Sequence, residues 1–257
     1  MEARGQAAIV TGAASGLGRA TAEALVAAGA SVAFADLNHE AAREAADAAE
    51  GPGKAIAIAC DVASSNSAEE AVAGAREAHG PARILINCAG VGTPGKIVGR
   101  DGPMALEDFS RVINVNLIGT FNMMRLAAAE MKGLDPLETG ERGIIVNTAS
   151  IAAYEGQIGQ AAYAASKGAI VSLTLPAARE FSRSGIRVTA IAPGIFGTPM
   201  LFGLSDEVQQ ALGASVPFPS RLGDPKEYAS LAMHMVGNAM MNGEVVRLDG
   251  ALRMAPI

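Results

Sequence analysis

Several residue types are scarce in this chain. It contains no tryptophan, and aromatic residues make up only 4% of its 257 positions. Its two cysteines, Cys60 and Cys88, are too few for a disulfide framework or a structural zinc site. The three histidines, His39, His79 and His234, stand far apart in the sequence. We therefore expect reduced thiols, a core of aliphatic and small side chains, and no metal.

Basic clusters and long apolar runs are also missing. The chain has 20 basic and 26 acidic residues, scattered along its length, for a net charge of −6. No stretch could neutralise a row of phosphates, so nucleic acid is not an expected partner. No apolar run reaches the roughly 18 to 20 residues of a membrane helix, and the first residues resemble neither a signal nor a transit peptide. These features favour a cytoplasmic protein without a membrane partner.

Short aliphatic runs alternate with longer Ala-rich segments, a pattern that predicts βα units. We expect an α/β fold with a doubly wound, Rossmann-type parallel sheet and helices on both faces. No stretch marks an internal boundary, so residues 1–257 are expected to form one domain. Strands are predicted near residues 6–11, 31–36, 54–60, 83–88, 143–148, 186–191 and 244–248.

Capping residues mark several helix starts. The expected caps are Asn38, a capping box of Ser67 and Glu70, and the group Asp224, Pro225 and Glu227. One helix, expected over 157–182, contains Pro176, which cannot donate to the Ser172 carbonyl. A kink or an early end is predicted there.

A glycine-rich loop follows the first strand and precedes a helical segment. Gly12, Gly16 and Gly18 would let the backbone turn tightly and approach a pyrophosphate, whose charge suits the helix N-terminus. Asp36 ends the second strand, where this fold places an acid on the adenosine ribose. A 2′-phosphate would meet this carboxylate without a compensating arginine, since Leu37 follows it. The pattern predicts NAD rather than NADP.

Other strand ends complete the predicted cofactor site. Asp61 and Val62 would hold the adenine, and the small residues Cys88, Ala89 and Gly90 would permit close approach. Cys88 is interpreted as a packing residue, because nothing nearby would lower its pKa. After the sixth strand, segment 193–198 should close over the nicotinamide. The full predicted set is Gly12, Ser15, Gly16, Leu17, Gly18, Asp36, Asp61, Val62, Cys88, Ala89, Gly90, Tyr163, Lys167, Pro193, Phe196 and Thr198.

A phenol and an ammonium lie four residues apart at Tyr163 and Lys167, on one face of a predicted helix. Ser150 ends the fifth strand, at the edge of the sheet where ligands bind. A phenol can take a proton from an alcohol if nearby positive charge lowers its pKa, here expected from Lys167 and oxidised nicotinamide. Ser150 would hydrogen-bond the substrate oxygen. Ser150 and Tyr163 are thus the predicted substrate-binding residues.

Together these motifs resemble the short-chain dehydrogenase/reductase family over essentially the whole chain. The glycine loop, segment 87–90, Asn116, the Ser150–Tyr163–Lys167 set and Pro193-Gly194 carry the resemblance. It implies that Lys167 also binds the nicotinamide ribose, and that Asn116 holds a water linking Lys167 to solvent. It further implies a homotetramer with interfaces on the helices 106–131 and 157–182 and the C-terminal segment.

The substrate expectation rests on a subgroup of that family. Segments 147–150, 156–163, 216–225 and 242–251 resemble members that oxidise 3-hydroxyacyl-CoA esters and 17β-hydroxysteroids. We expect a short or branched 3-hydroxyacyl-CoA as substrate. Alternatives are a hydroxysteroid dehydrogenase, an NADPH-dependent 3-oxoacyl reductase, and a scaffold or RNA-processing subunit.

Two further segments have open interpretations. Lys96 and Arg100 in the loop 91–103 could meet a CoA phosphate or could be solvated charges. Segment 199–219, with Met200, Leu201, Phe202 and Leu204, could be a mobile substrate lid or an ordinary surface helix.

Overall fold

A parallel sheet organises the computed structural model, which describes residues 1–203 and 205–256, without the side chains of Met200 and Phe202. Its strands are β1 (Ala7–Thr11), β2 (Ser31–Asp36), β3 (Lys54–Ala59), β4 (Ile84–Asn87), β7 (Gly143–Thr148), β8 (Ile186–Pro193) and β9 (Val245–Leu248). Their spatial order is β3-β2-β1-β4-β7-β8-β9, and every pairing is parallel. The predicted doubly wound sheet is confirmed, and the chain order reverses between β1 and β4, where such sheets bind ligands.

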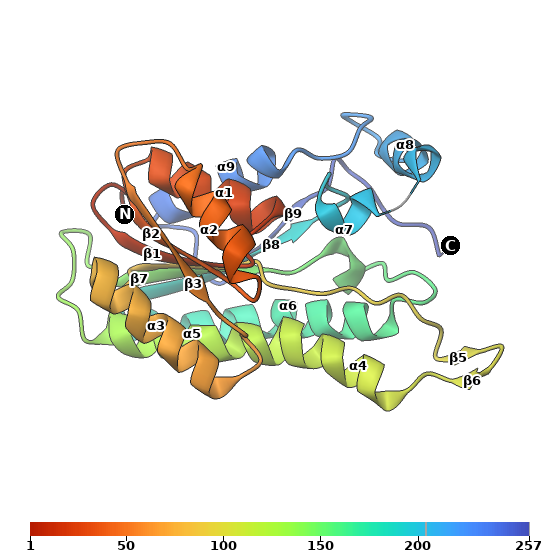
Figure 1. Cartoon of the computed structure of the whole chain (residues 1–257), viewed down its shortest axis with the longest axis horizontal. Helices are drawn as coiled ribbons and strands as arrows, with labels where there is room; N and C mark the ends of the chain where they lie inside the picture. Colours follow the sequence, from red (N-terminus) through yellow and green to blue (C-terminus); the bar gives the residue numbers. More distant parts are fainter. Residues whose placement is uncertain (204, 257) are drawn as a thin grey trace.

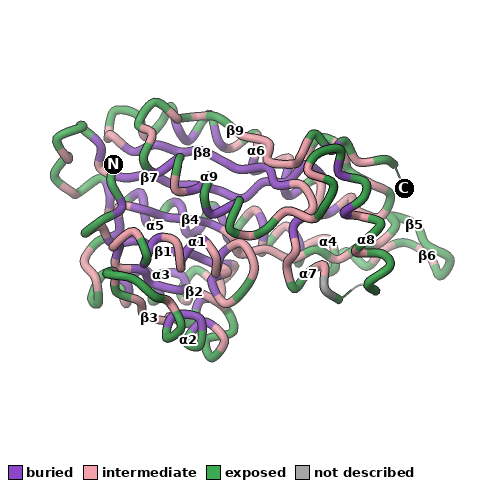
Figure 2. The backbone as a smooth tube through the Cα atoms, turned by 90° about the horizontal axis from the view of Figure 1, so that it is seen from above, coloured by how far each residue is buried: buried purple, intermediate pink, exposed green. Residues whose placement is uncertain are grey.

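Helices cover both faces of this sheet (Figure 1). One face carries α1 (Gly16–Ala27), α2 (His39–Asp47) and α9 (Pro225–Gly237), and the other carries α3 (Ser65–His79), α5 (Thr120–Lys132) and α6 (Ala161–Phe181). Alternate residues of each strand serve the two faces: Ile84 and Ile86 pack toward α1, and Leu85 packs toward α5. The inner strands are therefore buried along most of their length, whereas the edge strands β3 and β9 are only partly buried (Figure 2).

The long helix that was expected over 106–131 contains a π-helical turn. Helix α4 (Leu106–Ile113) runs without a break through the turn Asn114–Gly119 into α5. Such turns are rare and often lie at functional sites. This one contains Asn116, which is completely buried.

The helix caps agree with the sequence at two of three places. The Asn38 side chain accepts the Ala41 N–H at 3.2 Å, and Asp224 forms the expected capping box with Glu227. The capping box of Ser67 and Glu70 was wrong. Ser64 is the N-cap and accepts the Ser67 N–H at 3.3 Å, while the Ser67 hydroxyl accepts the Asp61 N–H.

Pro176 lies inside α6 without ending it, because the helix continues to Phe181. Both Pro176 and Ser172 are on the exposed side, where water can satisfy the carbonyl that the proline leaves unpaired. The helix begins at Ala161, four residues later than expected. None of the helices in the described part of the chain is long and apolar enough to cross a bilayer.

Three exposed segments gather at the end of the molecule opposite the N-terminus (Figures 1 and 2). The loop 91–103 contains a small hairpin, β5 (Val98–Gly99) and β6 (Gly102–Pro103). The predicted lid contains α7 (Pro199–Phe202) and α8 (Asp206–Ala214), while Leu204 lies outside the described residues. The C-terminal residues complete this end.

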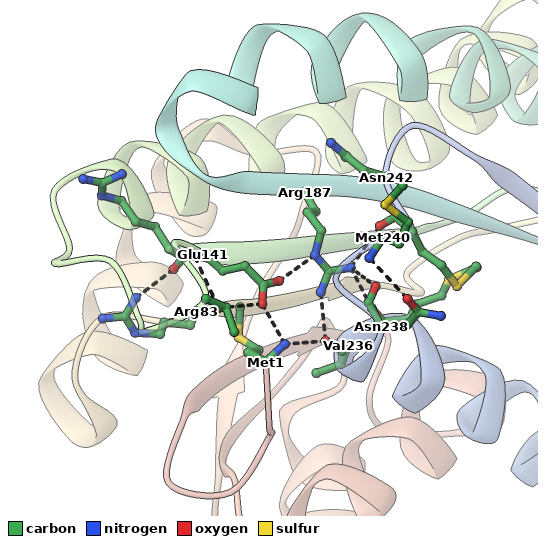
Figure 3. A network of polar contacts seen from close by, with 12 residues as sticks. Met1, Arg83, Glu141, Arg187, Val236, Asn238, Met240 and Asn242 are labelled. Carbon is green, nitrogen blue, oxygen red and sulfur yellow. Dashed lines mark hydrogen bonds and ion pairs between the residues drawn. The ribbon is translucent and has the colours of Figure 1, made fainter.

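A buried charge network lies at the opposite end, where the strands begin (Figure 3). Arg187 donates from Nε to Glu141 at 2.6 Å, and the Met1 amino group donates to the same carboxylate at 2.9 Å. The remaining Arg187 donors bind the carbonyls of Met235, Val236, Asn238 and Met241. Burial works to raise the pKa of Glu141, but these hydrogen bonds outweigh it and hold the pKa below its usual value.

Candidate active site

The glycine loop joins β1 to α1 by close backbone packing. A Cβ at Gly12 would lie 2.8 Å from the Ala89 nitrogen, and one at Gly18 would lie 2.2 Å from the Gly12 carbonyl oxygen. Only glycine fits either position. Ser15 is exposed at the N-cap of α1, and its hydroxyl makes no capping hydrogen bond. The helix start thus offers N–H groups and a hydroxyl beside Leu17, as a pyrophosphate site requires.

Asp36 lies against this loop. Its carboxylate accepts the Ala14 N–H at 3.0 Å and the Asn38 N–H at 2.9 Å, which fix it at the end of β2. The residue stays half-buried, and neighbouring Leu37 is exposed. A carboxylate in this position accepts hydrogen bonds from ribose hydroxyls and repels a phosphate.

The next strand ends line the same edge. Asp61 accepts the Ala63 N–H at 3.0 Å, and buried Val62 packs on Gly119 of the π-helical turn. The N–H groups of Cys88 and Ala89 both approach the Thr11 hydroxyl at 3.2 Å. These contacts hold the loops after β3 and β4 beside the glycine loop.

The segment after β8 returns to the glycine loop. A Cβ at Gly16 would lie 3.3 Å from the Thr198 side chain, so Thr198 borders the glycine loop. Pro193 ends β8 in register with Leu248. The Phe196 ring is buried and fills the space above Gly223, where a Cβ would come within 2.7 Å of it. The Phe196 ring thus packs inside the protein, while its backbone pairs with Gly223.

These residues fit a dinucleotide well. The glycine loop leaves space for a pyrophosphate, the carboxylates of Asp36 and Asp61 offer hydrogen-bond acceptors after β2 and β3, and the residues up to Gly90 are small. Among the described residues there is no group of three or more His, Cys, Asp or Glu that could hold a metal ion.

The structure brings Ser150, Tyr163 and Lys167 together beyond β7. Ser150 caps a short 3₁₀ turn, accepts the Ala152 N–H at 3.1 Å and lies close enough to Tyr163 to lower the pKa of its phenol. The Lys167 ammonium lies 5.8 Å from the centre of the Tyr163 ring. A hydroxyl, a phenol and an ammonium from two separate elements thus converge at the carboxyl edge of the sheet.

The electrostatics of this group differ from the expectation in one respect. Burial raises the pKa of Tyr163, against the hydrogen bond from Ser150, which lowers it. Burial also lowers the pKa of Lys167 to about 8. The expected lowering of the phenol pKa by Lys167 is therefore not found in the protein alone, because loss of water around the phenol outweighs the hydrogen bond from Ser150.

Asn116 uses its side chain for structure. Its amide accepts the Val91 N–H at 2.8 Å and donates to the Val91 carbonyl at 2.9 Å and to the Ser166 hydroxyl at 3.0 Å. These bonds fix the loop after β4 to α6, next to Lys167. The expected water would have to use the backbone of Asn116, whose carbonyl already accepts the Thr120 hydroxyl at 2.7 Å.

Sequence reasoning missed two residues of this region. The Thr148 carbonyl accepts a hydrogen bond from Lys167 at 2.7 Å, and the Thr148 hydroxyl lies 2.7 Å from that of Tyr228. Tyr228 comes from α9, 80 positions along the chain. No local pattern marked it, whereas the position of Thr148 at a strand end was a usable signal.

Comparison with known proteins gives consistent matches. Residues 6–209 match the family model described as short chain dehydrogenase. The chain is 52% identical to a 3-hydroxyacyl-CoA dehydrogenase type-2 from Bos taurus, over 98% of this chain and 97% of the relative. The Homo sapiens protein of the same name is 49% identical, with the same coverage.

A solved structure agrees with these matches. The crystal structure of a 3-hydroxyacyl-CoA dehydrogenase type-2 from Mycobacterium avium has a TM-score of 0.91 and 43% identity. The alignment covers 98% of both chains. The likeness therefore extends over nearly the whole chain.

Proposed function

This chain belongs to the short-chain dehydrogenase/reductase family, and we propose that it oxidises a short or branched 3-hydroxyacyl-CoA to the 3-oxoacyl-CoA with NAD. It is an oxidoreductase that acts on CH–OH groups and uses a nicotinamide cofactor. The observation that carries the proposal is that Ser150, Tyr163 and Lys167 lie together at the same edge of the sheet as the glycine loop.

In this proposal each of the three side chains has its own role in the oxidation of the alcohol. The Ser150 hydroxyl orients the substrate oxygen, and Tyr163 takes the hydroxyl proton as the carbon–oxygen double bond forms. When bound, oxidised nicotinamide would accept the hydride from the carbinol carbon and add positive charge beside Tyr163. Lys167 stabilises the phenolate and holds the nicotinamide ribose.

NAD is favoured by the position of Asp36. Its carboxylate is fixed by the Ala14 and Asn38 N–H groups, so it cannot easily turn away from a 2′-phosphate. The remaining cofactor contacts are proposed for the loops that hold Asp61, Gly90 and Thr198. Cys60 and Cys88 are free thiols, which suits the reducing cytoplasm in which we expect the enzyme to act.

A substrate panel with the purified full chain tests this function. Initial rates would be measured with racemic 3-hydroxybutyryl-CoA and with a 17β-hydroxysteroid, each with NAD and NADP. We expect the highest kcat/KM for the CoA ester with NAD. Activity on the steroid alone would overturn the substrate, and faster rates with NADP would overturn the cofactor.

The Asp36→Asn variant provides the matched control for cofactor choice. It keeps the side-chain size and one acceptor but removes the charge. We expect the preference for NAD over NADP to fall, because the phosphate no longer meets a carboxylate. An unchanged preference would show that Asp36 does not select the cofactor.

We also propose a homotetramer formed through the α4–α5 and α6 helices and the C-terminal segment. Large apolar side chains are exposed on these helices: Phe121 is 48% exposed, and Ile118 and Leu175 are similarly open. Such side chains on adjacent turns favour burial against another copy. Light scattering would measure the mass, and Phe121→Glu should dissociate the assembly. A monomeric wild-type protein would overturn this.

A further inference from the structure

Thr148 connects three elements around the proposed catalytic group. As the last residue of β7, it offers its carbonyl to the Lys167 ammonium at 2.7 Å. Its hydroxyl lies 2.6 Å from the Asn87 carbonyl at the end of β4 and 2.7 Å from the Tyr228 hydroxyl of α9. Ser150 follows two positions later. The position of Thr148 therefore determines where the Lys167 ammonium and the Ser150 hydroxyl lie.

The direction of these hydrogen bonds follows from counting protons. A threonine hydroxyl has one proton, and the Asn87 carbonyl can only accept. The short bond to Asn87 therefore takes the Thr148 proton, in preference to the weaker contact with the Cys88 sulfur at 3.5 Å. The Tyr228 hydroxyl must then donate to Thr148. It can in turn accept from the Cys88 thiol at 3.7 Å.

Burial restricts the Tyr228 hydroxyl to its hydrogen bond with Thr148. Tyr228 is 0% exposed and packs in the core cluster between the sheet, α1 and α9. Burial raises the pKa of Tyr228 well above its usual value, which keeps the phenol protonated and able to donate. Water does not compete for the bond, so Tyr228 has one geometry in which its hydroxyl is satisfied.

We propose that Tyr228 is a positioning residue for the dehydrogenase site. By donating to Thr148 it holds the end of β7 against α9, and so places the Thr148 carbonyl on Lys167 and Ser150 on Tyr163. Tyr228 lies on the opposite face of the sheet from Lys167 and α6, and its hydrogen bond to Thr148 links its hydroxyl to Lys167. The inference rests on the proposed function, because it assigns Lys167 and Ser150 their roles.

Tyr228→Phe removes the hydroxyl and keeps the ring, and Tyr154→Phe is the matched control. Tyr154 is half-exposed and lies against Arg247, away from Thr148. We expect Tyr228→Phe to lower kcat roughly tenfold with KM within about twofold, since small misplacements of reacting groups reduce turnover strongly. Tyr154→Phe should keep the wild-type kcat. A tenfold loss in both variants would overturn the proposal.

Variants of Thr148 test the same link from the other side. Thr148→Val removes the acceptor and should lose about as much kcat as Tyr228→Phe, whereas Thr148→Ser keeps the hydroxyl and should lose less. The double variant Tyr228→Phe/Thr148→Val should be no slower than Thr148→Val, because both changes break one bond. Additive losses would contradict the coupling.

A readout without substrate separates this inference from the proposed function. The titration of Lys167 can be followed by NMR of ¹³C-labelled lysine in the free protein. We expect its pKa, about 8 in the wild type, to move lower in Tyr228→Phe as the carbonyl acceptor shifts. If only thermal stability falls while kcat and this titration stay unchanged, Tyr228 is a core residue and the proposal fails. A wild type inactive on every 3-hydroxyacyl-CoA would refute the function but leave this NMR test intact.

Discussion

The two ends of the parallel sheet use polar residues in opposite ways. At the amino end, Arg187 and Glu141 are buried, and the donors of Arg187 bind a carboxylate and four carbonyls (Figure 3). At the carboxyl end, Ser15 of the glycine loop is exposed, and Asp36 and Tyr163 are half-buried. The first arrangement satisfies its charges within the protein, and the second keeps polar groups available to a ligand.

This difference predicts that substitutions at the two ends of the sheet affect different properties of the protein. Changes at the amino end should reduce stability without altering the chemistry of the folded enzyme. Changes at the carboxyl end should reduce turnover, because binding and catalysis require groups that the fold does not fully satisfy itself. Helix α9 is the exception, since it begins near the site and ends at the Arg187 network.

The largest effect is expected for Tyr163→Phe at the carboxyl end. Removal of the proposed base should lower kcat by about 10²- to 10⁴-fold, as for other groups that transfer protons. The ring remains, so NAD should still bind, which calorimetry would measure. Retention of more than a tenth of the wild-type rate would refute the role of Tyr163.

The amino end should respond to Arg187→Met mainly in stability. This change leaves Glu141 paired with the Met1 ammonium alone and removes the donors of four carbonyls, and breaking a buried ion pair typically costs about 3–5 kcal/mol. Chemical denaturation would measure the free energy of unfolding, and kcat of the remaining folded protein should stay within about twofold. A large loss of kcat at full stability would break the proposed separation of the two ends.

The paired change Arg187→Met/Glu141→Leu sharpens this test. It also removes the carboxylate that pairs with the buried Met1 ammonium, so the loss should be larger than for Arg187→Met alone. An equal or smaller loss would mean that Glu141 contributes to stability only through Arg187.

The contrast between the ends also explains what could be predicted from sequence. Continuous aliphatic runs such as Ile84–Ile86 identify buried parallel strands, and the glycine loop and the Tyr163–Lys167 spacing are local patterns. The Arg187–Glu141 pair joins positions 46 residues apart, and Tyr228 meets Thr148 across 80. Such contacts arise from packing, which no local pattern encodes.

Local choices between similar residues were also hard to predict. Ser64 and Ser67 both suit a helix cap, and only the folded backbone gives Ser64 the extended conformation that a cap requires. The π-helical turn at Asn116 left no trace in the helical periodicity. The pKa of Tyr163 depends on burial, which spacing alone does not reveal.

A smaller effect, dependent on pH, is expected from Lys167. Its pKa is lowered from 10.5 to about 8, so between these values the unfolded chain holds a proton that the folded protein has released. The free energy of unfolding should therefore rise with pH across this window and be lowest, for this group, below about pH 8. The measurement is the stability of the wild type minus that of Lys167→Met at each pH. A difference that falls or stays constant would contradict the buried ammonium.

The smallest effect is expected where α9 begins. Asp224→Ala removes the acceptor for the Lys226 N–H, a bond of 2.8 Å, and should cost about 1 kcal/mol, while Asp224→Asn should keep most of it. The melting temperature should fall by about 2–4 °C with little change in kcat. Helix α9 carries Tyr228 one turn after this cap and meets Arg187 at its other end. The result therefore tells whether the start of α9 affects mainly stability, like the amino end of the sheet, or turnover, like the carboxyl end. A loss of kcat beyond about fivefold, at nearly full stability, would mean that the cap positions Tyr228 and that the whole helix belongs to the catalytic end.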